Sequence, residues 1–509
     1  MVVRNFRLTM NKFRLLLIFM CLLMQVYAQQ PSKIHLVHSN SLEYDETNGG
    51  KVRKLIGDVQ FEHEGSYMYC DSAYFPLDSN FIQCFSKVHI IKNDTVHIYG
   101  DKLNYDGDKK FAEMFKHVKM NDNTMTLTTE HMTYDMVKDV ANYNENARIV
   151  DKENVLTSLI GYYYSDERLF AFHKNVVLTN PKYIIHTDTM KYSTDSKTAF
   201  FFGPTKITSK ENLIYAENGW YDTDKDVSSF KENSYIITKE QRLKGDSLYY
   251  DRMKGIGKAF KNVEIFDTVQ KVIINGEYGE YHEQNDWSLV VDSAMMTQIF
   301  DKDSLYMHAD TLLSIFDSIN NIRTMFAFHH VRYFKSDLQG KCDSLVYSSK
   351  DSVTRMYKSP VVWSDENQMT GDTITITMRN KRVDSMNIYH NSFIISQEDT
   401  VRFNQIKGKN VTGYFDDSSH LYKVKVLGNG QTIYYAKDKE DKYVGVNRAD
   451  CSDIMIFIKN NKVDRISLLN LPDATFYPMK ELGIKELLLK DFKWLISKRP
   501  KEKLEIFKE

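Results

Sequence analysis

The sequence is poor in cysteine, has no excess charge of either sign and, beyond its first 28 residues, has no long hydrophobic run. It contains 5 cysteines in 509 residues, and none of them forms a Cys-x-x-Cys pair. This argues against zinc knuckles and dithiol redox sites. The 67 lysines and arginines are balanced by 68 acidic residues. Without a basic excess the chain lacks the charge that binds phosphate backbones, so we expect no nucleic-acid partner.

Catalytic and cofactor-binding motifs are also missing. No Gly-x-Ser-x-Gly, Gly-x-x-x-x-Gly-Lys or His-Glu-x-x-His sequence occurs. Gly255-Ile256-Gly257 lacks the third glycine of a dinucleotide-binding turn. The histidines are scattered, and only His35/His38 and His329/His330 lie close together. The sequence therefore predicts neither an enzyme nor a bound cofactor or metal.

The N-terminus has the three parts of a secretory signal. Four basic residues occur between Arg4 and Arg14, an apolar run extends from Leu15 to Met24, and small residues near Ala28 suit cleavage. The apolar run is shorter than the roughly 20 residues that a spanning helix needs. We therefore predict a cleaved signal peptide over residues 1–28 and an exported mature chain.

Four cysteines remain after the predicted cleavage. An oxidising compartment permits disulfides, and Cys70 and Cys84 are the candidate local pair. Buried free thiols are the alternative, and the sequence leaves both open.

Two short phrases alternate along the chain and define a repeat. The first is aromatic-x-x-Val-x-apolar, as in Phe85–Ile90, and the second is acidic-x-apolar-x-aromatic, as in Asp101–Tyr105. Successive units are 29 or 30 residues apart, as measured at Val59, Val88, Val118, Ala147, Val176, Thr205, Ser234 and Val263. Later units are less regular. So regular a period indicates a repeat architecture.

Each phrase alternates apolar and polar residues, which is typical of a half-buried strand. A 29-residue unit therefore supplies about two strands, and neighbouring units must stack to bury their apolar faces. We predict an all-β fold, an elongated β-jellyroll or solenoid-like stack over residues 29–470, with the best-matched repeats in 33–420. The recurring acidic residue of the second phrase is expected to bond turn amides at strand entry.

The C-terminal residues 471–509 break the pattern. Leu482, Glu486, Leu489, Phe492 and Ile496 fall on neighbouring turns of a helix that we predict from Met479 to Glu509. Such a helix could cap the last open sheet edge or dock onto a membrane partner.

The series that begins with Gly57-Asp58-Val59-Gln60-Phe61 and Cys70-Asp71-Ser72-Ala73-Tyr74-Phe75 resembles the OstA-like repeat. This repeat occurs in the LptA family and in the N-terminal domain of LptD. The resemblance covers most of residues 33–420. It implies a twisted β-jellyroll in the periplasm whose V-shaped interior shields the acyl chains of lipopolysaccharide. The chain departs from the family in being much longer than single-domain members, and it lacks the barrel region of LptD.

The apolar members of each strand are the expected inner face and the expected lipid contacts. They are Phe61, Val88, Ile90, Leu103, Tyr105, Val118, Met132, Tyr134, Val176, Leu178, Met190, Tyr192, Leu248, Tyr250, Val263 and Ile265. The alternative is that these side chains only pack against one another.

The function expected from this resemblance is a bridge that carries lipopolysaccharide to the outer membrane. Expected partners are lipopolysaccharide or lipid A, other transport components joined by edge-strand addition, and further copies joined head to tail. Partners could link the protein to the inner or outer membrane. The alternatives are a structural or adhesive β-repeat protein without lipid cargo and a polysaccharide-active β-helix enzyme.

Overall fold

The computed structural model describes residues 32–45, 51–92, 94–122, 124–210, 212–239, 241–301, 303–380, 382–418, 420–460, 462–479, 483 and 487–508. The predicted signal peptide, residues 1–28, lies outside them. The chain divides into two compact units, Met1–Asp195 and Ser196–Glu509, and each is described by itself. Within the described residues no helix is long and apolar enough to cross a membrane.

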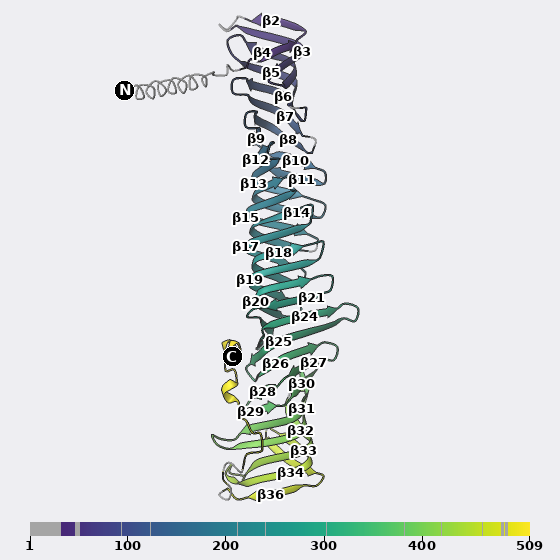
Figure 1. Ribbon diagram of the computed structural model, residues 1–509, viewed down its shortest axis with the longest axis vertical. Coiled ribbons are helices and arrows are strands. Elements are labelled where there is room, and N and C mark those ends of the chain that lie inside the picture. The colour runs from purple at the N-terminus through teal and green to yellow at the C-terminus, as the bar shows by residue number, and fades with distance from the viewer. Residues whose placement is uncertain are drawn as a thin grey trace, which may run out of the picture. The chain divides into compact units, whose positions relative to one another are not determined.

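Unit 1 consists of strands and turns (Figure 1). Its strands are β1 (His35–His38), β2 (Ser41–Asp45), β3 (Val52–His63), β4 (Ser66–Pro76), β5 (Phe81–Lys92), β6 (Val96–Asp106), β7 (Phe111–Asn121), β8 (Thr126–Asp135), β9 (Val140–Tyr143), β10 (Ala147–Asp151), β11 (Asn154–Ser158), β12 (Ile160–Tyr164), β13 (Leu169–Thr179) and β14 (Tyr183–Ser193).

Unit 2 continues the same pattern. Its strands are β15 (Thr198–Ser209), β16 (Leu213–Asp222), β17 (Val227–Ile237), β18 (Gln241–Asp251), β19 (Ile256–Asp267), β20 (Val272–His282), β21 (Trp287–Val291), β22 (Met295–Ile299), β23 (Ser304–His308), β24 (Thr311–Asp317), β25 (Ile322–Lys335), β26 (Leu338–Ser348), β27 (Val353–Tyr357), β28 (Val361–Ser364), β29 (Asn367–Thr370), β30 (Thr373–Arg379), β31 (Arg382–Gln397), β32 (Phe403–Phe415), β33 (Leu421–Lys437), β34 (Tyr443–Lys459), β35 (Lys462–Leu469) and β36 (Asp473–Tyr477). Two short 3₁₀ helices follow, η2 (Ile496–Lys498) and η3 (Lys503–Phe507).

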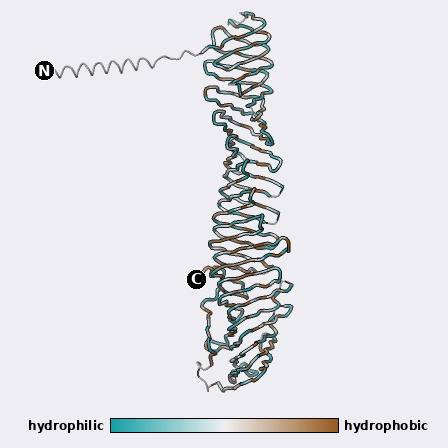
Figure 2. Tube along the Cα trace, turned by 45° about the vertical axis from the view of Figure 1, so that its right-hand side comes forward, coloured by the Kyte–Doolittle hydropathy of each residue, from teal (hydrophilic) through white to brown (hydrophobic). Residues whose placement is uncertain are grey.

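Within each unit the chain runs as a meander in which successive long strands pair antiparallel. The pairs β5–β6 and β6–β7 in unit 1, and β17–β18 and β18–β19 in unit 2, are examples. One repeat, from Val88 to Val118, contains the end of β5, all of β6 and most of β7, so two strands are added per period. The predicted all-β fold is confirmed. Hydrophobic and hydrophilic segments alternate along the strands (Figure 2).

Strands that carry the first phrase bend at a corner of two residues with positive φ. Examples are Ser86 and Lys87 (64° and 46°) and Lys116 and His117 (62° and 46°), and the pairing register shifts there. The residue after each corner is the repeating valine position, and Val88 and Val118 are each 1% exposed. The corner thus folds each strand into two halves, which pack together. Phe61, after the β3 corner, meets Phe75 edge to face at 5.7 Å across the interior.

The acidic residues of the second phrase lie beside these corners, in the middle of their strands. Asp101 Oδ2 is 2.8 Å from the Nδ1 of His117, and the Asn262 amide donates to Asp246 at 3.1 Å. The prediction that these acids bond turn amides at strand entry was therefore wrong for these two residues. The carboxylates bind side chains of the neighbouring corner, and this role is architectural, as their recurrence indicates.

The helix predicted from Met479 to Glu509 is absent from described residues 487–508, whose helical residues are all 3₁₀ and include η2 and η3. Leu482 and Glu486 lie outside the described residues. Leu489 and Phe492 instead pack against strands of unit 2. These contacts, and hydrogen bonds between its backbone and buried glutamines, hold the segment in an irregular form with turns and short 3₁₀ stretches. The structure therefore does not show the predicted helix over these residues, and docking onto a membrane partner stays a prediction.

Candidate functional site in the apolar interior

The structure places the predicted inner residues on strands of both units. Thirteen of the sixteen are buried, and Tyr192, Tyr250 and Ile265 are half-buried. Residues Phe61 to Tyr192 belong to unit 1, and Leu248 to Ile265 belong to unit 2. Their burial fits both an acyl-chain trough and simple mutual packing, so their role as lipid contacts stays a prediction.

The interior of unit 1 is tightly filled. Leu103 and Ile90 are 0% exposed. A Cβ added to Gly100 would lie 2.6 Å from Met114, and one added to Gly161 would lie 2.3 Å from Tyr143. Since side chains already occupy the space at these positions, an acyl chain could enter only if the two halves moved apart.

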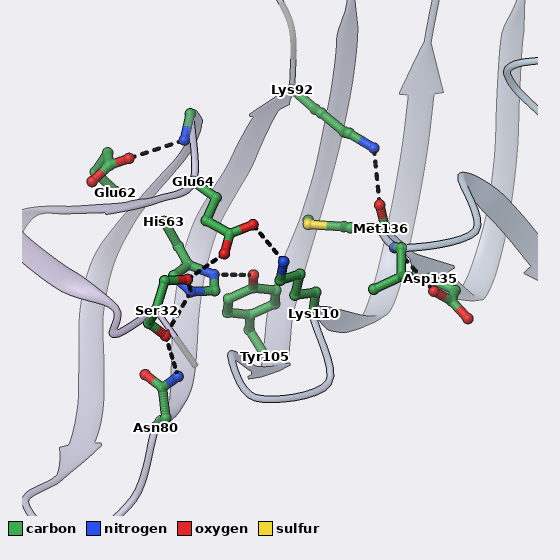
Figure 3. Close-up of polar contacts among 12 residues, drawn as sticks. Ser32, Glu62, His63, Glu64, Asn80, Lys92, Tyr105, Lys110, Asp135 and Met136 are labelled. Carbon is green, nitrogen blue, oxygen red and sulfur yellow. Dashed lines mark hydrogen bonds and ion pairs between the residues drawn. The ribbon is translucent and has the colours of Figure 1, made fainter. Parts of the chain in front are cut away.

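Tyrosines 29 residues apart lie at one edge of unit 1, and Figure 3 shows the first of them, Tyr105, beside His63. The hydroxyl of Tyr105, at the end of β6, lies 2.6 Å from the Nδ1 of His63, at the end of β3. Tyr134 donates to Asp139 at 2.8 Å, and Lys92 pairs with the same carboxylate. Burial raises the pKa of Tyr105 and Tyr134. These buried, bonded phenols form a row of polar links that we call the seam.

Other contacts extend the seam. Tyr163 donates to Asp122. Lys110 Nζ lies 2.6 Å from Glu64 Oε2, and the hydrogen bond from Lys110 lowers the pKa of Glu64. The pairs Tyr163–Asp122, Lys110–Glu64 and Lys92–Asp139 join turns at opposite ends of the folded strands, so we expect the seam to hold the two halves of unit 1 together.

Several small residues line the interior of unit 2 along β17–β20. Ser234 and Gly245 are cross-strand neighbours there, as are Ala259 and Gly279, while Gly257 lies two residues before Ala259 on β19. A Cβ added to Gly257 would meet only Tyr250, at 3.8 Å, within 4 Å. Space is therefore left beside Gly257, whereas a Cβ added to Gly279 or Gly276 of β20 would lie 3.0 Å from Val263 or 2.4 Å from Val290.

Half-buried apolar side chains flank these small residues. Ile236 pairs with Leu243, Leu243 with Ile265 and Ile265 with Ile274, while Tyr250 and Tyr281 pair with Gly257 on the other half. All are half-buried. Apolar surface that water still reaches gains free energy when an acyl chain covers it. This inner face of β17–β20 is the candidate site, and sequence reasoning identified only part of it, because glycines carry no hydrophobic signal.

An aromatic stack on the outer face of unit 1 was also missed. His89 stacks on Tyr99 at 4.2 Å, and its Nε2 lies 3.1 Å from the Nδ1 of His97. Burial and the neighbouring His97 lower the pKa of His89. The alternation of the strand places these rings outward, where they stabilise cross-strand pairing.

The remaining site predictions concern cysteines and metals. The structure has Cys70 and Cys84 as buried free thiols. The hydrogen bond with Cys70 and burial raise the pKa of Cys84. The two thiols are neighbours, so the disulfide stays a prediction. Among the described residues no three His, Cys, Asp or Glu side chains group as metal ligands.

Comparison with known proteins supports the repeat assignment for the N-terminal part of the chain. Residues 31–188 match the family model described as OstA-like protein, which confirms the resemblance there. No curated protein matches the chain. A similar solved structure is the crystal structure of LptH, the LptA homologous periplasmic component of the conserved lipopolysaccharide transport device from Pseudomonas aeruginosa. It is 13% identical, with a TM-score of 0.20, over 21% of this chain and 81% of that chain.

Proposed function

We propose that the protein is a non-enzymatic periplasmic scaffold that binds lipid and shields the acyl chains of lipopolysaccharide during transport to the outer membrane. The observation that carries this proposal is the inner face of β17–β20, where half-buried isoleucine, leucine and tyrosine surround glycines. The OstA-like match over residues 31–188 supports the same function. Lipopolysaccharide-transport components at either membrane would be its partners, joined through terminal edge strands.

The physical basis is transfer of acyl chains out of water. Each methylene that leaves water gains about 0.8 kcal/mol, without any specific polar partner. Because the inner positions recur with each pair of strands, a bound chain meets similar surfaces as it moves along a unit. Such a surface favours transport over tight, local binding.

The test is photo-crosslinking in cells with p-benzoylphenylalanine. The photo-reactive residue replaces each of the inward residues Tyr250 and Ile265 in separate variants. The outward neighbours Tyr249 and Glu264, replaced in the same way, serve as matched controls. All four are half-buried residues of β18 or β19. We expect crosslinks to lipopolysaccharide from the inward pair and not from the outward pair. Equal yields from both pairs, or none from the inward pair, would contradict the proposal.

A structural or adhesive protein without lipid cargo is the second candidate. The filled interior of unit 1 favours it, because closely packed inner side chains need no ligand. Lipid extraction of the purified protein distinguishes the two: stoichiometric lipid A supports the scaffold, and its absence supports the structural role.

A further inference from the structure

The C-terminal residues 487–508, which we call the strap, lie along unit 2 instead of adding to its sheet. Leu487 and Leu489, 7% and 4% exposed, join a cluster with Phe393, Ile395 and Ile433. Further along, η3 contacts β23 and β25. The strap therefore runs from β32–β33 back to β23, across many strands (Figure 1).

The strap covers the outer face of these strands. In β31, Met386 and Ile388 belong to the main core of unit 2, and Ile394 packs against that core from beyond the corner. Phe393 and Ile395 flank Ile394 and so point to the opposite side, where they contact the strap. The strap shields the apolar side chains of this outer face from water.

Two fully buried glutamines hold the backbone of the strap. Gln405 donates to the carbonyl of Leu487 at 2.9 Å and accepts from the N–H of Leu489 at 2.9 Å. Gln368 donates to the carbonyl of Lys493 at 2.7 Å and accepts from the N–H of Leu495 at 2.6 Å. Each side-chain amide makes the two hydrogen bonds that a neighbouring strand would make. The recognised groups are backbone groups, which any extended peptide possesses.

Side chains add selectivity along the strap. Phe492 and Trp494 both lie 5.2 Å, ring to ring, from Phe403. Arg499 donates to Gln339 at 2.7 Å and to the carbonyl of Asp365 at 2.8 Å. The face therefore selects a peptide with leucines, then aromatic residues, then an arginine.

We propose that this outer face is a peptide-binding site, that residues 487–499 occupy it as an intramolecular ligand, and that the same segment of a second copy of this chain can replace them. Both copies would make identical contacts, so exchange costs little beyond the loss of the tether. Ten Cα–Cα steps separate Tyr477 from Leu487, which allows a reach of up to about 35 Å. An empty site is disfavoured, because the apolar side chains of Phe393, Ile395 and Ile433 would then be exposed to water.

The first experiment uses the full chain with a protease site introduced between residues 479 and 487. After cleavage of the folded protein, fluorescence anisotropy follows a labelled peptide of residues 484–509. We expect the labelled peptide to replace the cleaved strap. An excess of unlabelled peptide should then displace the labelled peptide. Combining Gln368→Ala with Gln405→Ala should weaken binding about tenfold or more. Gln83→Ala, on a half-buried residue of unit 1, is the matched control and should leave binding unchanged.

The second experiment tests the second copy as the occupant. Intact protein carrying p-benzoylphenylalanine at Leu489 is mixed, in isotopically heavy and light forms, at high concentration before irradiation. Heavy–light crosslinks to Phe393 or Ile433 are the expected result. If crosslinks form only within single chains, the exchange between copies is refuted. If the strap stays bound after cleavage and does not exchange with added peptide while the protein remains folded, the peptide-binding site itself is refuted. Circular dichroism of each sample identifies unfolded variants.

Discussion

Breaking the seam of unit 1 should expose its interior, and Cys84 provides a probe for that opening. Cys84 is 0% exposed and pairs across strands with Leu103, two residues before Tyr105. The hydrogen bond with Cys70 and burial hold the pKa of Cys84 well above its ordinary value. A thiol reagent should therefore reach it only when the two halves separate, so the labelling rate reports the opening equilibrium.

The perturbation is Tyr105→Phe, which keeps the ring and removes the hydroxyl. Tyr105 and His63 are 1% and 2% exposed, so the imidazole would lose a buried partner. Leaving a buried polar group unsatisfied costs about 1–3 kcal/mol. Such a cost corresponds to a roughly 5- to 150-fold increase in the opening equilibrium constant and in the labelling rate of Cys84.

The assay is mass spectrometry of the reduced protein after timed alkylation, with peptide mapping to separate Cys84 from Cys70. Tyr99→Phe is the matched control, since Tyr99 is 38% exposed on the outer face of the same strand. Its labelling rate should equal that of the unaltered protein. Equal rates for Tyr105→Phe and Tyr99→Phe would show that the Tyr105 link does not hold the halves together.

Three further predictions concern Ser234, Asp343 and the pair Cys70 and Cys84. Ser234 takes the repeating valine position, and its hydroxyl is fully buried without a hydrogen-bond partner among the described residues. Ser234→Ala should raise the free energy of unfolding of unit 2 by about 1 kcal/mol in urea titrations, and a fall of that size would refute the account. Hydrogen bonds from Ser344 and Lys358 lower the pKa of Asp343 to about 2. Because this pKa is depressed in the folded state, its stabilisation is present above pH 4 and is lost as the pH falls towards 2; Asp343→Asn should remove that part of the pH dependence of thermal unfolding. Protein isolated from an oxidising compartment without reductant should yield a linked Cys70–Cys84 peptide, and two alkylated peptides instead would establish free thiols.

The repeat made the strands predictable, because alternation and a 29-residue period are local signals. The corners were not predictable in the same way. Lys116 and His117 adopt positive φ, although only the histidine belongs to the residue types enriched there. Their conformation is imposed by the need to turn the strand between the two halves, and this need is a tertiary constraint.

The strap shows where sequence periodicity misleads. Leu489, Phe492 and Ile496 have helical spacing, which predicts a helix from local information alone. Their environment is set by buried glutamines far away in the sequence. Gln405 accepts a hydrogen bond from the N–H of Leu489, 84 residues away, and Gln368 accepts one from the N–H of Leu495, 127 residues away. No local signal reveals such partners. The buried glutamines were missed because amide side chains in strands usually face solvent.

The fixed corner also determines where the chain can tolerate a change of length. One residue added between a corner and the following turn would turn that half-strand inside out and send its apolar side chains into water. Residues added at the hairpin turns leave the facing of every side chain intact. From the first residue of one corner to the first of the next, the spacing is 29 residues between Glu232 and Lys261, 31 to Asp292 and 37 to His329. We therefore expect natural variants of this chain to gain or lose residues at the hairpin tips, and engineered insertions such as epitope tags to succeed there.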